Sequence, residues 1–282
     1  QYDGTTDVAS SDLTLIGEVS GESISITGTG SVTDKNVGAG KTINTTGLSL
    51  ADNTSNASNY SLSTGTFTIN NKILSISRTR SYDGSTAVLS VYNSLNGLIG
   101  SETLNKSVSV STSLPNASTY GSASINTTAL LLSDGSNGGL ISNYTLLGGS
   151  HSTTISKKSI GVNGSKVYDG NSSAAASNLS LTGLIGSETL NLSGSGTITT
   201  SAVGDNKSVT NLNFTLSDNS GAAANYTLNG TLEINVTQRP VVVSGSKVYD
   251  GNTTVDDSNL TTFSNLVGSE TVSYTHLTLP TS

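Results

Sequence analysis

The sequence has no cysteine, no methionine and no tryptophan, and only 5% of its residues are aromatic. Without cysteine, disulfides and thiolate metal sites are excluded, so stability must come from packing and backbone pairing. The longest apolar runs, such as 129–132 and 241–243, fall far short of the roughly 18 residues that a membrane helix needs. We therefore expect no membrane span in this segment.

Charge is also scarce, because Asp, Glu, Lys and Arg together make up 11% of the residues. The 19 acidic and 12 basic residues give a net charge of −7, and the basic ones are scattered. A nucleic-acid-binding surface needs clustered basic residues that neutralise phosphates, so we expect no nucleic-acid partner. The polar composition does not predict disorder, because the apolar residues alternate as they do in strands and the charged fraction is low.

What the sequence has in abundance is repetition. The triplet Tyr-Asp-Gly occurs four times at nearly equal spacing along the chain, as one recurring structural unit would. A glutamate follows each triplet at an almost constant distance, and an Asn-Tyr pair closes the first three units. The triplet residues are Tyr2, Asp3, Gly4, Tyr82, Asp83, Gly84, Tyr168, Asp169, Gly170, Tyr249, Asp250 and Gly251; the glutamates are Glu22, Glu102, Glu188 and Glu270; the pair tyrosines are Tyr60, Tyr144 and Tyr226.

This period divides the chain into three nearly whole repeats and a fragment. We assign the first repeat to 1–71, lacking its first strand, the second to 72–157, the third to 158–238 and a partial fourth to 239–282. Residues 274–282 depart from the pattern and receive no functional weight. No charged and apolar secretion leader precedes the first triplet, so we expect the true start of the protein to lie elsewhere.

Within a repeat, apolar and polar residues alternate over short segments, for example at Leu212, Phe214 and Leu216. Turn pairs such as Asn163-Gly164 separate these segments, and no helical period competes. The pattern predicts an all-β fold of tandem antiparallel β-sandwiches, immunoglobulin-like in architecture; a β-grasp-like fold or a partly open barrel is the alternative. The last strand of one repeat passes almost directly into the next repeat, so we expect an elongated rod.

Longer strings recur around the triplets: KVYDG at 166–170 and 247–251, DKNVGAGK at 34–41, NYSL at 59–62, and NYTL at 143–146 and 225–228. Together they resemble the YDG-type repeats of large bacterial surface proteins, of which the filamentous haemagglutinin-like adhesins are the best-known carriers. The second repeat departs most, because TYGSASI at 119–125 replaces a DKNVGAGK-like segment.

This resemblance implies a secreted bacterial protein at the cell surface, associated with the outer membrane through other parts of the chain. It implies that the repeats serve as a stalk or passenger that supports cell adhesion. The lack of cysteine suits export through an oxidising compartment, where a disulfide would obstruct threading of the chain. The family assigns no catalytic, cofactor-binding or metal-binding residues to these repeats.

The triplet residues allow a structural and a functional interpretation. The tyrosines could be exposed ligand-stacking aromatics, but a tyrosine that ends a strand before a turn more often buries its ring and hydrogen-bonds its hydroxyl. The aspartates are typical of turns in which the carboxylate accepts backbone N–H groups and the glycine takes a positive φ. Calcium binding is the alternative, although no D-x-[DN]-x-[DN]-G pattern occurs.

The repeated glutamates and the two histidines give little support to catalysis. Successive glutamates lie a whole repeat apart, so we interpret them as solvated residues at strand edges rather than as the paired carboxylates of a glycosidase. His151 and His276 do not recur at matching positions, so neither a repeated metal site nor a Ser-His-Asp arrangement is expected.

Our leading hypothesis is a non-enzymatic stalk or passenger segment that needs no cofactor and whose partners are neighbouring repeats of the same longer chain. The alternative is a carbohydrate- or protein-binding β-module that recognises host or biofilm ligands. In that case the variable loops at 53–58, 136–141 and 219–224 would present the binding residues on a constant scaffold. An enzyme is a remote third possibility.

Overall fold

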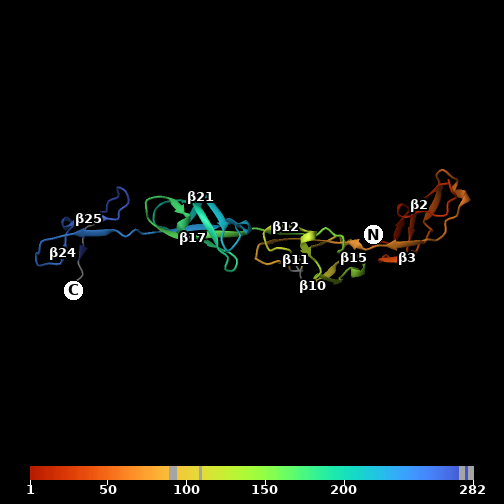
Figure 1. The fold of residues 1–282 in the computed structure, drawn as a ribbon, viewed down its shortest axis with the longest axis horizontal. Helices are drawn as coiled ribbons and strands as arrows, with labels where there is room; N and C mark the ends of the chain where they lie inside the picture. Colours follow the sequence, from red (N-terminus) through yellow and green to blue (C-terminus); the bar gives the residue numbers. More distant parts are fainter. Residues whose placement is uncertain (89–93, 108–109, 273–276, 279–282) are drawn as a thin grey trace. The chain divides into compact units, whose positions relative to one another are not determined.

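The computed structural model describes residues 1–88, 94–107, 110–272 and 277–278. The fold is all-β, with short 3-10 turns between strands (Figure 1). The chain divides into two compact units, Gln1–Ser156 and Lys157–Ser282. In the part of the chain that is described, no helix has the length and apolar character needed to cross a membrane.

The first repeat consists of short antiparallel strands whose alternating residues supply one buried face. In one sheet β2 lies between β1 and β4, and β3 pairs with β5. Val8 and Ile24 are buried on this inner face while their neighbours are more exposed, as the two-residue period of a strand requires. The bounds are β1 Asp7–Ala9, β2 Ile24–Ser31, β3 Gly38–Thr42, β4 Leu48–Asp52 and β5 Thr66–Ile69, with 3-10 turns η1 Ser10–Asp12 and η2 Ala57–Asn59.

The rest of the first unit begins with β6 and β7 and ends with β15 and β16. Here β7 lies between β16, which runs parallel to it, and β9, which runs antiparallel. The bounds are β6 Lys72–Ile73, β7 Ser75–Ser81, β8 Ala87–Val88, β9 Ser94–Asn96, β10 Leu104–Ser107, β11 Val110–Thr112, β12 Ser118–Gly121, β13 Ile125–Asn126, β14 Leu131–Asp134, β15 Tyr144–Thr145 and β16 Ser152–Ser156, with η4 Ser122–Ser124 and η5 Ile141–Asn143.

The second unit contains longer strands. Its described strands include a six-stranded sheet with the order β18-β20-β21-β22-β17-β19, and separate pairs β23–β25 and β24–β26. The bounds are β17 Lys158–Val167, β18 Ser173–Ala175, β19 Leu179–Thr182, β20 Leu190–Ile198, β21 Gly204–Asp218, β22 Tyr226–Thr237, β23 Val242–Gly245, β24 Thr254–Val255, β25 Leu260–Ser264 and β26 Leu277–Thr278, with η6 Ala176–Asn178, η7 Ala223–Asn225 and η8 Asp257–Asn259.

The expectation of purely antiparallel pairing is wrong. Parallel pairs join β6 to β15, β7 to β16 and β17 to β22. In each case the strand that opens a predicted repeat lies beside the strand that closes it. Parallel neighbours need a long crossover connection, and local alternation along the sequence carries no information about such distant pairing.

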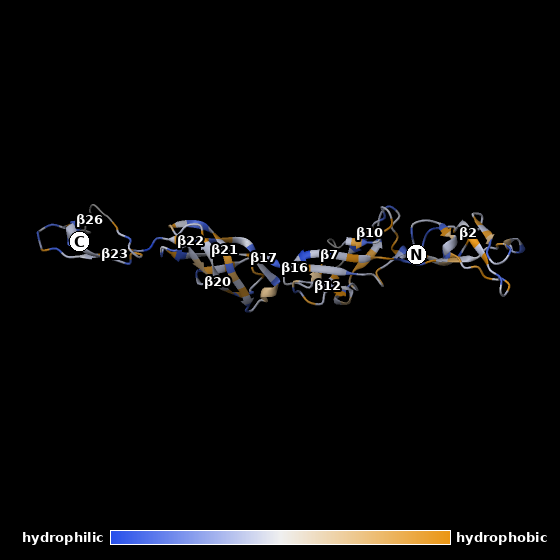
Figure 2. Cartoon of the chain, turned by 90° about the horizontal axis from the view of Figure 1, so that it is seen from above, coloured by the Kyte–Doolittle hydropathy of each residue, from blue (hydrophilic) through white to orange (hydrophobic). Residues whose placement is uncertain are grey.

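Two hydrophobic clusters can be traced among the described residues, and apolar residues recur along the strands of both units (Figure 2). The first cluster spans the predicted boundary at 71/72, because Leu74 and Tyr144 pack with residues of the first repeat such as Val8. The second cluster, in β18 and β20 to β22, includes Ile198 and Ile234. The first two predicted repeats therefore share this cluster, while other buried apolar residues of the second repeat, such as Ile76 and Ile155, lie outside it.

Candidate functional site: the Tyr-Asp-Gly turns and their partners

Each Tyr-Asp-Gly triplet forms the same local turn. The aspartate carboxylate accepts a hydrogen bond from the backbone N–H two residues later, at 2.9 Å in Asp3 and Asp83 and at 3.1 Å in Asp169 and Asp250. The following glycines have φ angles of 82°, 76°, 79° and 77°. This left-handed conformation is strained for residues with a Cβ, so glycine suits the position.

A basic side chain two residues before the tyrosine holds the turn from inside. Lys166 forms an ion pair of 2.7 Å with Asp169 and donates to both the backbone O and Oδ1 of Asn171 at 3.0 Å and to the Ser173 backbone O at 2.9 Å. Its side chain is only 4% exposed. Arg80 and Lys247 form the equivalent ion pairs with Asp83 and Asp250.

Sequence reasoning missed this contact. The basic residues that recur most regularly, Lys72, Lys158 and Arg239, lie ten positions before a triplet tyrosine. The basic residue that contacts the turn lies two positions before the tyrosine. The signal was present, because the recurring string KVYDG places Lys166 and Lys247 at this position and Arg80 stands there in the second copy.

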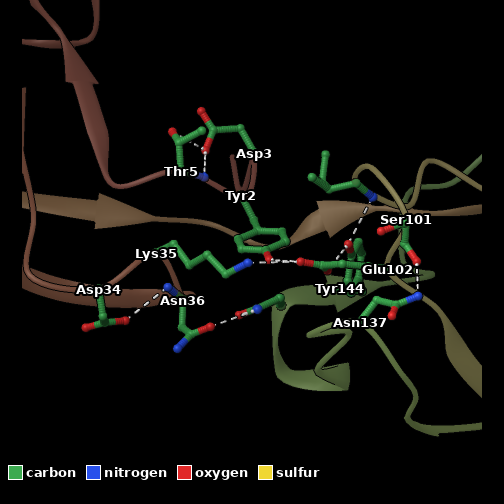
Figure 3. Close-up of polar contacts among 12 residues, drawn as sticks. Tyr2, Asp3, Thr5, Asp34, Lys35, Asn36, Ser101, Glu102, Asn137 and Tyr144 are labelled. Carbon is green, nitrogen blue, oxygen red and sulfur yellow. Dashed lines mark hydrogen bonds and ion pairs between the residues drawn. The ribbon is translucent and has the colours of Figure 1, made fainter.

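The tyrosine hydroxyl reaches a glutamate of the following repeat. Tyr2 Oη donates to Glu102 Oε1 at 2.5 Å, and Tyr144 Oη donates to Glu102 Oε2 at 2.6 Å (Figure 3). The two rings meet edge to face, with centroids 5.5 Å apart. Lys35 completes the cluster, with its Nζ 3.1 Å from Glu102 Oε1 and 5.8 Å from the centre of the Tyr2 ring.

We call Tyr2, Lys35, Glu102 and Tyr144 the junction cluster. Tyr2 is 1%, Tyr144 4% and Glu102 7% exposed, so the interpretation of Glu102 as a solvated strand-edge residue is wrong. A carboxylate is costly to bury unless it is paired and hydrogen-bonded, and here both of its oxygens have partners. The cluster therefore joins residues of the first and second predicted repeats through a buried polar contact.

Burial and hydrogen bonding shift the ionisation of this cluster. Burial, followed by the hydrogen bond to Glu102, raises the pKa of Tyr144 to about 12, and the same two causes raise the pKa of Tyr2. Burial on its own would raise the pKa of Glu102, but the hydrogen bonds from Tyr144, Tyr2 and Lys35 outweigh it, and this pKa lies below its ordinary value.

These shifts predict alkaline destabilisation of the first unit. A tyrosine in the unfolded chain has a pKa of about 10. Burial and the hydrogen bond to Glu102 raise the pKa of Tyr144 in the folded protein to about 12. The stability that Tyr144 contributes is thus fully present below about pH 10 and is lost as the pH rises towards about 12. We expect Tyr144→Phe to flatten this loss in urea unfolding followed by circular dichroism. Identical pH dependence in the two proteins would contradict the assignment.

The same pairing of tyrosine and glutamate recurs elsewhere. Tyr168 donates to Glu270, so the third triplet also contacts the glutamate of the repeat that follows it. Within single repeats, Tyr226 donates to Glu188 at 2.6 Å and Tyr60 donates to Glu22. Burial and Glu188 raise the pKa of Tyr226 to about 12.

Exposure differs among the four triplet tyrosines. Tyr2 and Tyr82 are buried and Tyr168 is half-buried, but Tyr249 is 93% exposed. The buried-ring interpretation therefore fails for Tyr249. Tyr2 and Tyr168 are covered by contacts from the following repeat, and local sequence, which is nearly the same at each copy, could not distinguish them from Tyr249.

The triplet glycines allow the following repeat to approach closely. A Cβ added to Gly4 would lie 2.7 Å from Ile99 Cγ2, and one added to Gly170 would lie 2.7 Å from Val267 Cγ1. Ile99 and Val267 each stand three residues before the glutamate that receives the tyrosine hydroxyl. Tyrosine and glycine of one triplet thus contact the same short segment of the next repeat.

Gly170→Ala should destabilise the second unit by about 2 kcal/mol, half from the positive φ and half from the clash with Val267. Gly251→Ala is the matched control, because Gly251 has φ +77° and no atom within 4 Å of an added Cβ; it should cost about 1 kcal/mol. Hydrogen exchange of residues 265–272 measures the difference locally. Equal loss of protection there in both variants would contradict the close contact.

The remaining candidates do not converge on a reactive centre. Across residues 1–88, 94–107, 110–272 and 277–278, no three His, Cys, Asp or Glu side chains form a group that could hold a metal ion. His151 accepts from the Ile76 backbone N–H at 3.2 Å, and its other ring nitrogen lies 3.2 Å from the Leu146 backbone O. His276 lies outside the described residues.

The variable loops are fixed at their bases by a recurring aspartate. The Oδ1 atoms of Asp52, Asp134 and Asp218 accept the backbone N–H groups of Ala57, Ile141 and Ala223 at 2.7, 2.8 and 2.7 Å. Each of these bonds closes one of the loops at 53–58, 136–141 and 219–224, so the loops share a constant base while their sequences differ.

Together these features define an all-β repeat protein whose most elaborate polar contacts lie where repeats meet. The YDG domain family model matches residues 1–67 and 151–234, just over half of the chain. The chain belongs to the YDG domain family. The unmatched stretch between these ranges includes most of the second repeat, which departs most from the pattern. No curated protein and no solved structure matches the chain.

Proposed function

We propose that this chain is a non-enzymatic stalk or passenger segment of a large bacterial cell-surface adhesin, in which tandem β-sandwich repeats form an elongated rod that supports adhesion. The observation that carries this proposal is the junction cluster, which links a triplet tyrosine to the glutamate of the next repeat. A buried contact at this place serves to hold successive repeats in a fixed relation rather than to bind a substrate.

The chain path at the first junction supports a stiff connection. Only Asn70 and Asn71 lie between β5 and β6, which leaves no room for a flexible linker. Asn71 Nδ2 donates to the backbone O of Ser142 at 2.8 Å, and the shared hydrophobic cluster spans the same place. Small polar interfaces permit relative motion of domains, whereas a shared apolar cluster with a buried, hydrogen-bonded carboxylate opposes it.

The resemblance and the composition support a location at the cell surface as part of this proposal. YDG-type repeats resemble those of filamentous haemagglutinin-like surface proteins, and a chain without cysteine is compatible with threading through an oxidising compartment. We therefore place the segment outside a bacterial cell, held at the outer membrane by other parts of the protein.

Small-angle scattering and single-molecule stretching test the stalk. We expect an elongated particle on the order of 100 Å long for three repeats. Stretching should give successive unfolding events of similar size, each releasing roughly 270 Å for a repeat of about 80 residues. The variant Glu102→Ala should leave the number of events unchanged but make the scattering particle more flexible, and Glu22→Ala is the matched control. A compact particle that unfolds in one event would contradict the proposal.

A second candidate function is ligand binding by the variable loops. It is favoured by the recurring aspartates Asp52, Asp134 and Asp218, which fix the base of each loop and leave its tip free to vary. A scaffold of this kind suits recognition of glycans or proteins. A glycan array probed with the whole chain tests ligand binding, and substitutions at the loop tip 53–55 are the specificity control. If no glycan binds above background, glycan recognition by the loops is excluded.

A further inference from the structure

The first and second repeats make a second polar contact beside the junction cluster. The Val37 backbone N–H donates to Asn143 Oδ1 at 3.0 Å, and Asn143 Nδ2 donates to Asn36 Oδ1 at 3.0 Å. Asn143 belongs to the closing Asn-Tyr pair of the second repeat and is 0% exposed. Asn36 adjoins Lys35, which contacts Glu102 (Figure 3). Two neighbouring side chains of the first repeat thus contact two recurring residues of the second.

These contacts come from one loop, residues 34–37, which we call the junction loop. Its base is closed within the first repeat, because Asp34 Oδ1 accepts the Asn36 backbone N–H at 3.0 Å and the Lys41 ammonium group at 2.8 Å. The loop is therefore held in shape by its own repeat. A group that is already in place loses less conformational entropy when it contacts a partner, so this support strengthens the contact with the second repeat.

The third repeat keeps the base of this loop. The step from the triplet tyrosine to the closing-pair tyrosine is the same in the first and third repeats, so residues 200–203 correspond to the junction loop. There Lys207 Nζ donates to Thr200 Oγ1 at 2.8 Å, in place of the bond between lysine and aspartate. A Cβ added to Gly204 would lie 3.1 Å from the Cε atom of this lysine, against 3.2 Å for Gly38 and the lysine of the first repeat. The two loops therefore share their local support.

The contact residues differ between the two loops. Ser201 stands at the position of Lys35, and Ala202 stands at the position of Asn36. Alanine has no polar side-chain atom, and the serine hydroxyl is uncharged and lies close to the backbone. Whichever repeat follows, neither residue can reproduce the ion pair of the lysine or the side-chain hydrogen bond of the asparagine. The two loops thus share a base and differ in what they can bind.

The residues that receive the junction loop recur along the chain. A glutamate follows each triplet, and an asparagine opens each closing pair, at Asn59, Asn143 and Asn225. Asn143 and Asn225 are 0% and 2% exposed, and burial of this kind fixes the orientation of an amide group through its hydrogen bonds. The receiving residues are therefore nearly constant, while the loop that they receive varies from repeat to repeat.

We propose that the junction loop is a recognition element for the repeat that follows, and that its second and third residues set the strength of that junction. Its partner is another YDG repeat, recognised through its glutamate and its closing-pair asparagine. Lys35 supplies a charge-assisted contact, and Asn36 with the Val37 backbone binds both polar atoms of one amide group, which depends on orientation. A repeat with lysine and asparagine at these positions makes a strong junction. The third repeat, with Ser201 and Ala202, makes a weaker one.

The role of the junction loop rests on the proposed function in one respect, because both need successive repeats in contact. It does not depend on a role in adhesion. Scattering and stretching measure the length and the independence of the repeats, whereas exchange of a single amide hydrogen measures the opening of one junction. A compact particle would contradict the stalk alone, and an amide that does not respond to changes in the loop would contradict the junction loop alone.

Hydrogen exchange of the Val37 amide in the full chain tests the junction loop, because this N–H is bonded to a side chain of the next repeat. The double variant Lys35→Ser with Asn36→Ala gives the first loop the residues of the third. It should lower the protection of the Val37 amide about tenfold, since an ion pair and a hydrogen bond to a buried amide are lost. Asn36→Asp should keep wild-type protection, because aspartate offers the receiving asparagine the same acceptor.

Asn53→Ala is the matched control. Asn53 Nδ2 donates to Ser23 Oγ at 3.0 Å within the first repeat, so this variant loses one comparable bond and should leave the Val37 amide unaffected. Amides of β2 serve as the internal reference and should keep their protection in the double variant. Unchanged protection of Val37 in the double variant, an equal fall in Asn36→Asp, or an equal fall throughout β2 would overturn the proposal.

Ser201→Lys tests whether the charge contact can be transferred to the third repeat. Tyr168 donates to Glu270, so a lysine at position 201 should reach this carboxylate as Lys35 reaches its own glutamate. The Glu270 backbone N–H, which donates to the Val267 backbone O at 3.1 Å, should then exchange about threefold more slowly at low salt, and high salt should remove the gain. Ser201→Gln, of similar length but uncharged, is the control and should leave the rate unchanged. No gain from lysine, or an equal gain from glutamine, would refute the proposal.

Discussion

Replacing Glu102 with alanine should lower the free energy of unfolding of the Gln1–Ser156 unit by about 4 kcal/mol. The substitution removes the acceptor of two buried tyrosine hydroxyls and the counter-ion of Lys35. Buried polar groups that lose their partner keep the cost of desolvation without the compensating bond. The loss should therefore exceed that of an average surface substitution several-fold.

Glu22→Ala is the matched control for this prediction. Glu22 holds the corresponding position in the first repeat and accepts from Tyr60, but it is exposed, so its loss should cost less than about 1 kcal/mol. Urea unfolding followed by circular dichroism gives the two values, and hydrogen exchange of 97–104 reports on the junction. A double-mutant cycle of Glu102→Ala and Tyr144→Phe should give a coupling energy of about 1–2 kcal/mol between the two residues. Equal costs for the two glutamates would mean that the junction cluster does not stabilise the unit.

The class of the fold could be predicted from the sequence because strand alternation and turn chemistry are local. Residues such as Leu212, Phe214 and Leu216 alternate within β21, and Asp169-Gly170 forms its turn through atoms only two residues apart. Interactions between residues that are close in the sequence constrain residue type and spacing, so they can be recognised from the sequence alone.

The site could not be predicted because its members come from different repeats. Tyr2 and Glu102 lie 100 residues apart, and the repeat pattern does not indicate which tyrosine each glutamate contacts. The structure pairs Glu102 and Glu270 with the triplet tyrosine of the preceding repeat. It pairs Glu22, Glu102 and Glu188 with the tyrosine of the closing Asn-Tyr pair. A periodic sequence defines which positions are equivalent, but the choice of partner within or between repeats depends on packing.

The parallel pairing of opening and closing strands explains why a triplet contacts the repeat that follows it. Because β5 passes through Asn70 and Asn71 into β6, the end of the first repeat lies at the start of the second. The triplet that follows an opening strand then faces the segment 99–102 of the next repeat, as Gly4 and Ile99 show. A constant triplet is required because each copy must fit its own turn and also a neighbouring surface.

Lys166→Met should destabilise the Lys157–Ser282 unit by about 3 kcal/mol, the second largest effect that we expect from a single substitution. Methionine keeps most of the volume of the lysine stem but removes the ammonium group. The Asp169 carboxylate then loses its ion pair, and the backbone O atoms of Asn171 and Ser173 lose a donor. The turn that presents Tyr168 to Glu270 should loosen as a result.

Lys247→Met separates the effect of burial from that of the contacts themselves. Lys247 binds the equivalent set, Asp250, Asn252 and the Thr254 backbone O, but its side chain is 18% exposed against 4% for Lys166. Water can replace part of the lost contacts there, so Lys247→Met should lower the free energy of unfolding by about 1 kcal/mol. Hydrogen exchange of residues 168–175 and 249–255 in the two variants measures both turns. If protection falls equally in the two variants, burial does not strengthen the contacts of the lysine ammonium group. The turn is then held mainly by its aspartate and glycine.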